Sequence, residues 1–74
     1  MSKSMWIPTE GDNFPIKREH DDRQSERVLV WIEGETRWDE GHYNYYFKDW
    51  EIDRWGRIPT NRVKYFAYID NPYK

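Results

Sequence analysis

Aromatic side chains outnumber the branched aliphatic ones, and this imbalance constrains the fold more than any other feature of the chain. Five Trp, six Tyr and three Phe stand against ten Ile, Val and Leu in 74 residues that include no cysteine. So short a chain buries only about 60% of the surface that its unfolded form exposes. Each buried aromatic ring removes roughly 150–250 Å² from water. The aromatics must therefore supply much of the core, and any ring left on the surface is informative.

The strongest strand signal is the β-branched and aromatic run at residues 28–32, Val-Leu-Val-Trp-Ile. A continuous run of this kind predicts a central strand that is covered on both faces. Glu33-Gly34-Glu35 predicts a hairpin turn into residues 36–38, and Asp39-Glu40-Gly41 predicts a second turn.

The second half of the chain alternates between apolar and polar residues, as strands do. Residues 42–47 predict one strand, Trp50–Ile52 a short one, and residues 62–69 the last. A turn at Arg54–Arg57, extended by a loop through Asn61, separates the last two.

Residues 9–27 are polar apart from Phe14-Pro15-Ile16, and residues 17–27 contain no apolar side chain. A short surface helix starting at Pro15 is one interpretation, but a helix that is polar all round has little to hold it. We therefore predict a mobile loop at 9–27 and a β core at 28–69. Residues 1–74 are expected to form one small, mainly β domain, an antiparallel meander of four to five strands with at most one short helix.

The aromatics divide into expected core and expected surface. Strand positions predict burial of Trp31, Trp38, Tyr45, Trp50 and Phe66. Trp55 lies in the turn Arg-Trp-Gly-Arg and is predicted to be exposed, and Tyr43, Tyr46 and Tyr68 are placed on the outer face of the sheet. Because Trp, Tyr and Arg are enriched at interface hot spots, these exposed residues are candidate binding residues.

Four cations and no acid lie between residues 54 and 64, interleaved with Trp55. The four are Arg54, Arg57, Arg62 and Lys64. Cations beside stacking aromatics hold single-stranded nucleic acid. A nucleic-acid binder normally has a net basic footprint, however, and the net charge here is −2. Nucleic-acid or nucleotide binding therefore ranks second to protein binding.

Catalytic and metal chemistry is poorly supported by the sequence. His20, Asp21, Asp22 and His42 match no metal-ligand spacing. The acidic pairs Glu33/Glu35 and Asp39/Glu40 fall in predicted turns, and the chain has neither a glycine-rich phosphate loop nor a cysteine nucleophile. We expect a non-enzymatic protein without a cofactor.

Several short motifs occur in a recognisable order. They are Trp6-Ile7-Pro8, Phe14-Pro15, residues 26–31 (Glu-Arg-Val-Leu-Val-Trp) and a closing Val63-x-x-Phe66 followed by Asn71-Pro72. The chain thereby resembles the phage and prophage family called domain of unknown function 551. The stretch between Pro15 and Val28 looks longer than in that family, and Phe66-Ala67-Tyr68 replaces its Trp-Met-Pro. The resemblance implies a small phage or prophage accessory protein and carries no catalytic residues.

The expected partner is a host or phage protein, and inhibition of a host defence factor is the concrete form of this hypothesis. A homodimer stays open as an alternative. No apolar run approaches the roughly 20 residues of a membrane span. We therefore expect no membrane partner and a cytoplasmic location in the bacterial host cell.

Overall fold

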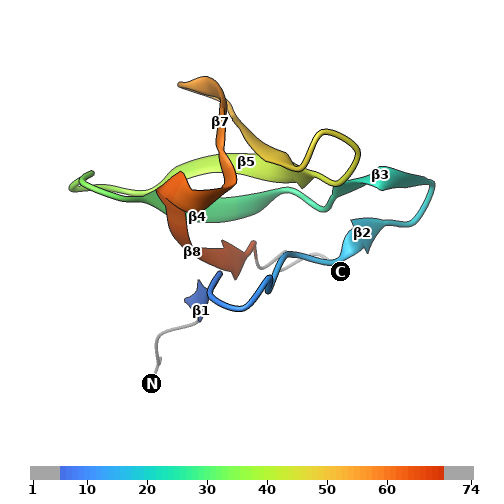
Figure 1. Cartoon of the computed structure of the whole chain (residues 1–74), viewed down its shortest axis with the longest axis horizontal. Helices are drawn as coiled ribbons and strands as arrows, with labels where there is room; N and C mark the ends of the chain where they lie inside the picture. The colour runs from blue at the N-terminus through green and yellow to red at the C-terminus, as the bar shows by residue number, and fades with distance from the viewer. Residues whose placement is uncertain (1–5, 70–74) are drawn as a thin grey trace.

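The computed structural model describes residues 6–69, which form one curled antiparallel sheet of eight strands (Figure 1). The strands are β1 (Ile7–Pro8), β2 (Lys17–Arg18), β3 (Asp21–Ser25), β4 (Val28–Ile32), β5 (Asp39–Asn44), β6 (Asp49–Ile52), β7 (Gly56–Pro59) and β8 (Val63–Tyr68). Within these described residues the helical structure is one 3₁₀ turn, η1 (Thr60–Arg62). The mainly β class is confirmed, with more strands than predicted. The Asn71-Pro72 motif lies outside the described residues.

Strands β4 to β7 form a consecutive meander, and β8 then returns to the free edge of β4. β4 is therefore central, as its sequence predicts, with β5 on one side and β8 on the other. β1 lies beyond β8. β3 continues the line of β4 along the same edge of β5, because Gln24 pairs with Asn44 and Val28 with Gly41.

The inner face of the curled sheet holds the core. Its buried members are Val28, Val30, Ile32, Tyr43, Trp50, Ile52, Val63 and Phe66. Burial of Trp50 and Phe66 is confirmed, whereas Trp31 and Tyr45 are only half-buried. Tyr43 was expected on the outer face, and that prediction is wrong. The residue pairs with Trp50 across β5 and β6, and the two rings lie 5.2 Å apart in the core.

The predicted loop at 9–27 is wrong for residues 17–25, which form the β2–β3 hairpin. Residues 9–16 instead run across the core, where the Phe14 ring stacks on Tyr43 with centroids 4.1 Å apart. Ser25 is fully buried, and its hydroxyl accepts a hydrogen bond from the Tyr43 N–H. Backbone pairing and a few buried side chains hold this segment in place. Its charged composition gives no sign of either, and the sequence therefore predicts a loop.

The predicted turn at Asp39-Glu40-Gly41 is also wrong, because these residues begin β5. Gly41 is needed for close packing, since a Cβ there would lie 2.3 Å from the Glu51 carbonyl oxygen. Residues 33–38 connect β4 to β5 and contain no strand, which leaves Trp38 half exposed instead of buried. The next turn begins at Tyr45, so Phe47 lies in a turn and not on a strand.

The Trp55 turn is confirmed, but it is shorter than expected. Ile58 and Pro59 were assigned to its loop, and they belong to β7. Among the described residues, no helix has the length and apolar character that crossing a bilayer requires.

Candidate binding surfaces

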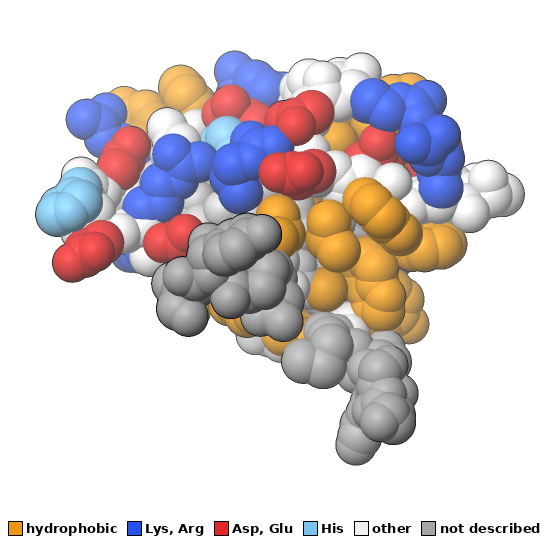
Figure 2. Space-filling model, turned by 180° about the vertical axis from the view of Figure 1, so that it is seen from behind, with side chains coloured by type: hydrophobic (Ala, Val, Ile, Leu, Met, Phe, Trp, Pro, Cys, Tyr) orange, Lys and Arg blue, Asp and Glu red, His pale blue; other side chains and the backbone are white. Residues whose placement is uncertain are grey.

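The outer face of the sheet is divided between apolar and charged side chains (Figure 2). Alternation along the strands explains the division, because residues beside a core residue point the other way. Leu29 and Trp31 alternate with buried Val28 and Val30, and Glu40 and His42 alternate with buried Gly41 and Tyr43. The outer face is therefore apolar over β4 and β8 and charged over β5 and β6.

The apolar half is built around three aromatic residues, Trp38, Trp31 and Tyr65, which we call the aromatic row. Trp31 of β4 pairs directly with Tyr65 of β8. Trp38 directly precedes β5, whose first residue Asp39 pairs with Val30, the neighbour of Trp31 in β4. The Trp6 ring meets Trp31 edge to face at 5.7 Å. Trp38 and Tyr65 are 50% and 45% exposed, which gives the row two open ends and a half-buried centre.

The charged half contains an ion-pair network around Arg27. The guanidinium of Arg27 lies 2.9 Å from a Glu40 carboxylate oxygen and 2.6 Å from one of Asp53. Hydrogen bonds to Asp53 and Glu40 raise the pKa of Arg27 above its ordinary value. These carboxylates are thus engaged by a cation, which leaves them ill suited to act as a general acid and base.

His42 lies in the same charged half with its side chain largely buried. Neither ring nitrogen has a hydrogen-bond partner, and Nε2 lies 3.7 Å from the Glu51 carboxylate. Burial lowers the pKa of His42, and the opposing attraction of Glu51 is smaller. The ring is therefore neutral at pH 7.

The structure does not unite the predicted Arg and aromatic residues around Trp55. Trp55 is 47% exposed, as predicted, but its indole N–H donates to Asp39 and Arg54 lies 3.8 Å from the same carboxylate. Arg57 pairs with Asp49 at 2.8 Å and Lys64 with Glu33 at 3.9 Å. Arg62 is exposed in η1. Acidic partners thus offset three of the four cations, and in strand order β4 to β6 separate Lys64 from Trp55.

The tyrosines predicted to be exposed have three different environments. Tyr43 is buried, Tyr46 is the most exposed aromatic of the described chain at 66%, and Tyr68 is partly exposed. The Tyr68 hydroxyl accepts a hydrogen bond from the Ile16 N–H, and its ring meets Phe66 edge to face. Tyr68 pairs with the core residue Val28, so it lies on the inner face and the predicted outer-face position is wrong. It serves to attach the 9–16 segment as much as to form a surface.

The pair Tyr46 and Phe47, which we call the aromatic tip, lies on the β5–β6 turn at the opposite end of β5 from Trp38. Phe47 is not among the predicted binding residues, because the sequence pattern places it at the end of a strand over residues 42–47 and not in a turn. Asn44 is the residue from which the sequence could have predicted this turn, since asparagine side chains commonly accept hydrogen bonds from the backbone of a following turn. Its Oδ1 accepts the N–H groups of both Tyr46 and Phe47 at 2.9 Å.

Within residues 6–69, no group of three or more His, Cys, Asp or Glu side chains is arranged to hold a metal ion. Comparison with family models, curated proteins and solved structures gives no match for this chain. Its function must therefore be argued from the surfaces themselves.

Proposed function

We propose that this protein is a non-enzymatic protein-binding module and that the aromatic row is its working surface. The observation that carries the proposal is the number of rings left outside a core that is short of aliphatics. Six aromatic side chains of the described part are more than 40% exposed, namely Trp38, Tyr46, Phe47, Trp55, Tyr65 and Tyr68. Tyr68 also attaches the 9–16 segment, but the exposed surface of the other rings adds little to the core, and binding explains that exposure.

The aromatic row has the composition of an interface centre. Hot spots are enriched in Trp and Tyr, cluster centrally and lie inside a polar rim. The half-buried Trp31 holds the middle of the row, and the Arg27 network supplies a polar border on the same face. Covering the exposed halves of Trp38 and Tyr65 would remove roughly 100 Å² each, or about 2–3 kcal/mol per ring.

The resemblance to the phage and prophage family supports a bacterial host or phage protein as the partner. We propose a cytoplasmic host factor of defence as the partner to test first, with this domain acting as its inhibitor. The observations favour protein over nucleic acid at Trp55, since Asp39 and Asp49 offset the neighbouring arginines.

The proposal is tested by affinity purification from a bacterial host lysate with three proteins. These are the native chain, a row variant carrying Trp38→Ser and Tyr65→Thr, and a matched variant carrying Tyr46→Ser and Phe47→Ser. All four substituted side chains are similarly exposed, so both variants are expected to fold. We expect one stoichiometric protein with the native chain and the matched variant, and none with the row variant.

Two outcomes would contradict the proposal. Equal capture by the row variant would remove the aromatic row from the interface. A native dimer in analytical ultracentrifugation that becomes monomeric in the row variant would show that a second copy of the chain covers the row.

A further inference from the structure

The aromatic tip is held in place before any ligand arrives. Its turn is fixed by the two hydrogen bonds to Asn44 Oδ1 and by a third from the Lys48 N–H to the Asn44 carbonyl. The Thr60 hydroxyl donates to the Lys48 carbonyl and so ties the turn to the start of η1. Lys48 adopts a φ of 60°, which closes the turn. A ligand that binds here does not have to order the loop, which lowers the cost of binding.

The two rings of the tip are the most exposed aromatic rings of the described chain, at 66% for Tyr46 and 55% for Phe47. They meet nearly at right angles, with centroids 4.9 Å apart. Neither ring belongs to the core cluster. The tip thus presents two largely exposed rings on a turn whose backbone is fixed, with Arg57 over Phe47 and Arg23 over Tyr46. The part of each ring that these side chains leave open is available for stacking with another flat ring.

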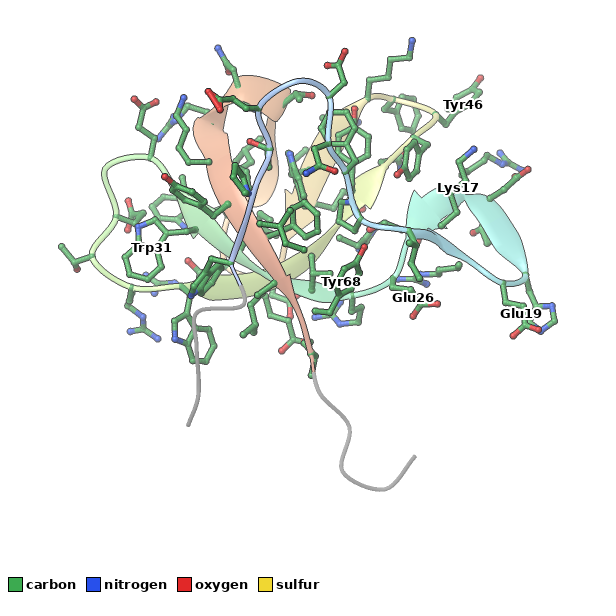
Figure 3. All side chains as sticks on the ribbon, turned by 90° about the horizontal axis from the view of Figure 1, so that it is seen from below. Lys17, Glu19, Glu26, Trp31, Tyr46 and Tyr68 are labelled. Atoms are coloured by element: carbon green, nitrogen blue, oxygen red, sulfur yellow. The ribbon has the colours of Figure 1, made fainter. Side chains whose placement is uncertain are left out.

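Cations from separate elements surround the tip. Arg57 of β7 lies 4.4 Å from the Phe47 ring centroid, and Arg23 of β3 lies 5.8 Å from that of Tyr46. Lys17 of β2 lies 4.9 Å from the ring of Tyr45, and Lys48 is in the turn itself. Figure 3 shows Lys17 and Tyr46 at the same end of the molecule, away from Trp31.

The acids near the tip offset only part of this positive charge. Asp49 is paired with Arg57, and the Asp21 carboxylate accepts the backbone N–H of Arg23. Asp12 lines a neighbouring groove together with Lys48. No ion pair links an acid to Lys17, Arg23 or Lys48 within the described residues, so their charges are available although the chain as a whole is slightly acidic.

The groove beside the turn extends the aromatic surface. It has a volume of about 410 Å³ and is lined by Asp12, Phe14, Tyr43, Tyr45, Lys48 and Thr60. Three aromatic side chains, one lysine, one threonine and one aspartate therefore border a space next to the turn residues Tyr45 and Lys48. The aromatic side chains and Lys48 suit a base with its attached phosphate, whereas the Asp12 carboxylate repels a phosphate and directs it toward the cations around the tip.

We propose that the aromatic tip and its cations bind single-stranded nucleic acid. Bases stack on Tyr46 and Phe47, and phosphates lie near Lys17, Arg23 and Lys48. Stacking on aromatics beside a basic groove is how sequence-tolerant single-strand binders work. An acidic peptide could use the same cations, but it has no requirement for two open rings. The site differs in position and in partner from the aromatic row.

The test is fluorescence anisotropy with a labelled ten-nucleotide oligo-dT and with an abasic strand that carries the same phosphates. We expect the abasic strand to bind at least about tenfold more weakly, because stacking contributes roughly 1–3 kcal/mol per base. With three phosphate contacts, the log–log salt dependence should have a slope of about −2.

Three variants localise the binding. Tyr46→Ser with Phe47→Ser should weaken oligo-dT at least about tenfold. Lys48→Gly should reduce the magnitude of the slope of log affinity against log salt concentration by about 0.7. Glycine adopts a φ of 60° without strain, so the turn is preserved in this variant. Trp55→Ser, at a comparably exposed ring in another turn, should change nothing.

Several outcomes would overturn the proposal. They are no binding of oligo-dT at low salt, equal binding of the abasic strand, or loss of binding in Trp55→Ser but not in the tip variant. Equal affinity for a ten-residue polyglutamate would show that charge alone is recognised and would also overturn it.

Discussion

At the residue scale, His42 shows how burial inside a charged surface creates a pH dependence. The groups that act on it are Glu51 and Asp53, which favour the protonated ring, and Arg18 and Arg27, which oppose it. Burial outweighs them and lowers the pKa below the ordinary 6.5. The folded state therefore binds a proton at His42 less readily than the unfolded state does. The contribution of neutral His42 to the free energy of unfolding is present above pH 6.5 and is lost as the pH falls below that value.

We predict that the free energy of unfolding of the native protein falls between pH 7 and pH 5 and that His42→Gln makes this decline shallower. Urea titrations at half-unit pH steps measure it. His20→Gln is the matched control, because the His20 side chain is almost fully exposed, and it should retain the native decline. A decline that is identical in His42→Gln and the native protein would show that His42 does not cause it.

Gly41 is the second residue whose role is local. Its missing Cβ lets β5 approach β6, where the Glu51 carbonyl oxygen would be only 2.3 Å from an added carbon. We predict that Gly41→Ala destabilises the domain by about 1–3 kcal/mol, as overpacking does, measured by chemical denaturation. Glu40→Ala in the same strand loses only a partly exposed ion pair and should cost less than about 1 kcal/mol. Similar losses in the two variants would remove the packing argument.

The sequence predicted some residues correctly for physical reasons that can be stated. Trp55 is half exposed because it lies in the turn between β6 and β7, outside the strands whose side chains alternate toward the core. Trp50 and Phe66 are buried because they occupy inward-facing positions on strands β6 and β8. Gly41 and Trp38 were misassigned because a glycine beside acids has the composition of a turn. Only the position of Glu51 on the neighbouring strand reveals why Gly41 is required.

At the element scale, the segment from Thr9 to Ser25 changes the interpretation of the whole fold. Phe14 covers the core between Tyr43 and Trp50, and the Tyr45 hydroxyl donates to the Pro15 carbonyl. The β2–β3 hairpin was missed because periodicity reports buried faces, and this hairpin buries little beyond Ser25. The central position of β4 was predictable because its run of apolar residues is continuous.

We predict that Phe14→Ala lowers the free energy of unfolding by about 2–4 kcal/mol, somewhat below the value for a fully buried phenylalanine. The ring is partly buried and stacked on Tyr43, so its loss uncovers the core. Ile16→Ala removes an exposed side chain of the same segment and should be nearly neutral. Thermal and urea denaturation of both variants measure the difference. A neutral Phe14→Ala would mean that the segment does not cover the core.

At the scale of the whole molecule, curling of the sheet gives a small chain two separate surfaces. One is the aromatic row on the outer face, and the other is the aromatic tip at the far end of β5. The candidate surfaces were only partly predictable, because the sequence identified Tyr46 and Arg57 but placed the cations around Trp55. Register across strands decided which aromatics meet, as Trp31 and Tyr65 are 34 positions apart in the sequence but paired in the sheet.

The most direct measurement is a titration of the purified partner with the native chain, the row variant and the matched tip variant. Two interface aromatics with hot-spot character, each contributing about 2 kcal/mol, together contribute about 4 kcal/mol and predict a Kd several hundredfold higher for the row variant. The tip variant should remain within about threefold of the native Kd, a difference well below 1 kcal/mol. A row variant that binds as tightly as the native chain, with both variants folded, would contradict the proposal that the aromatic row is the binding surface.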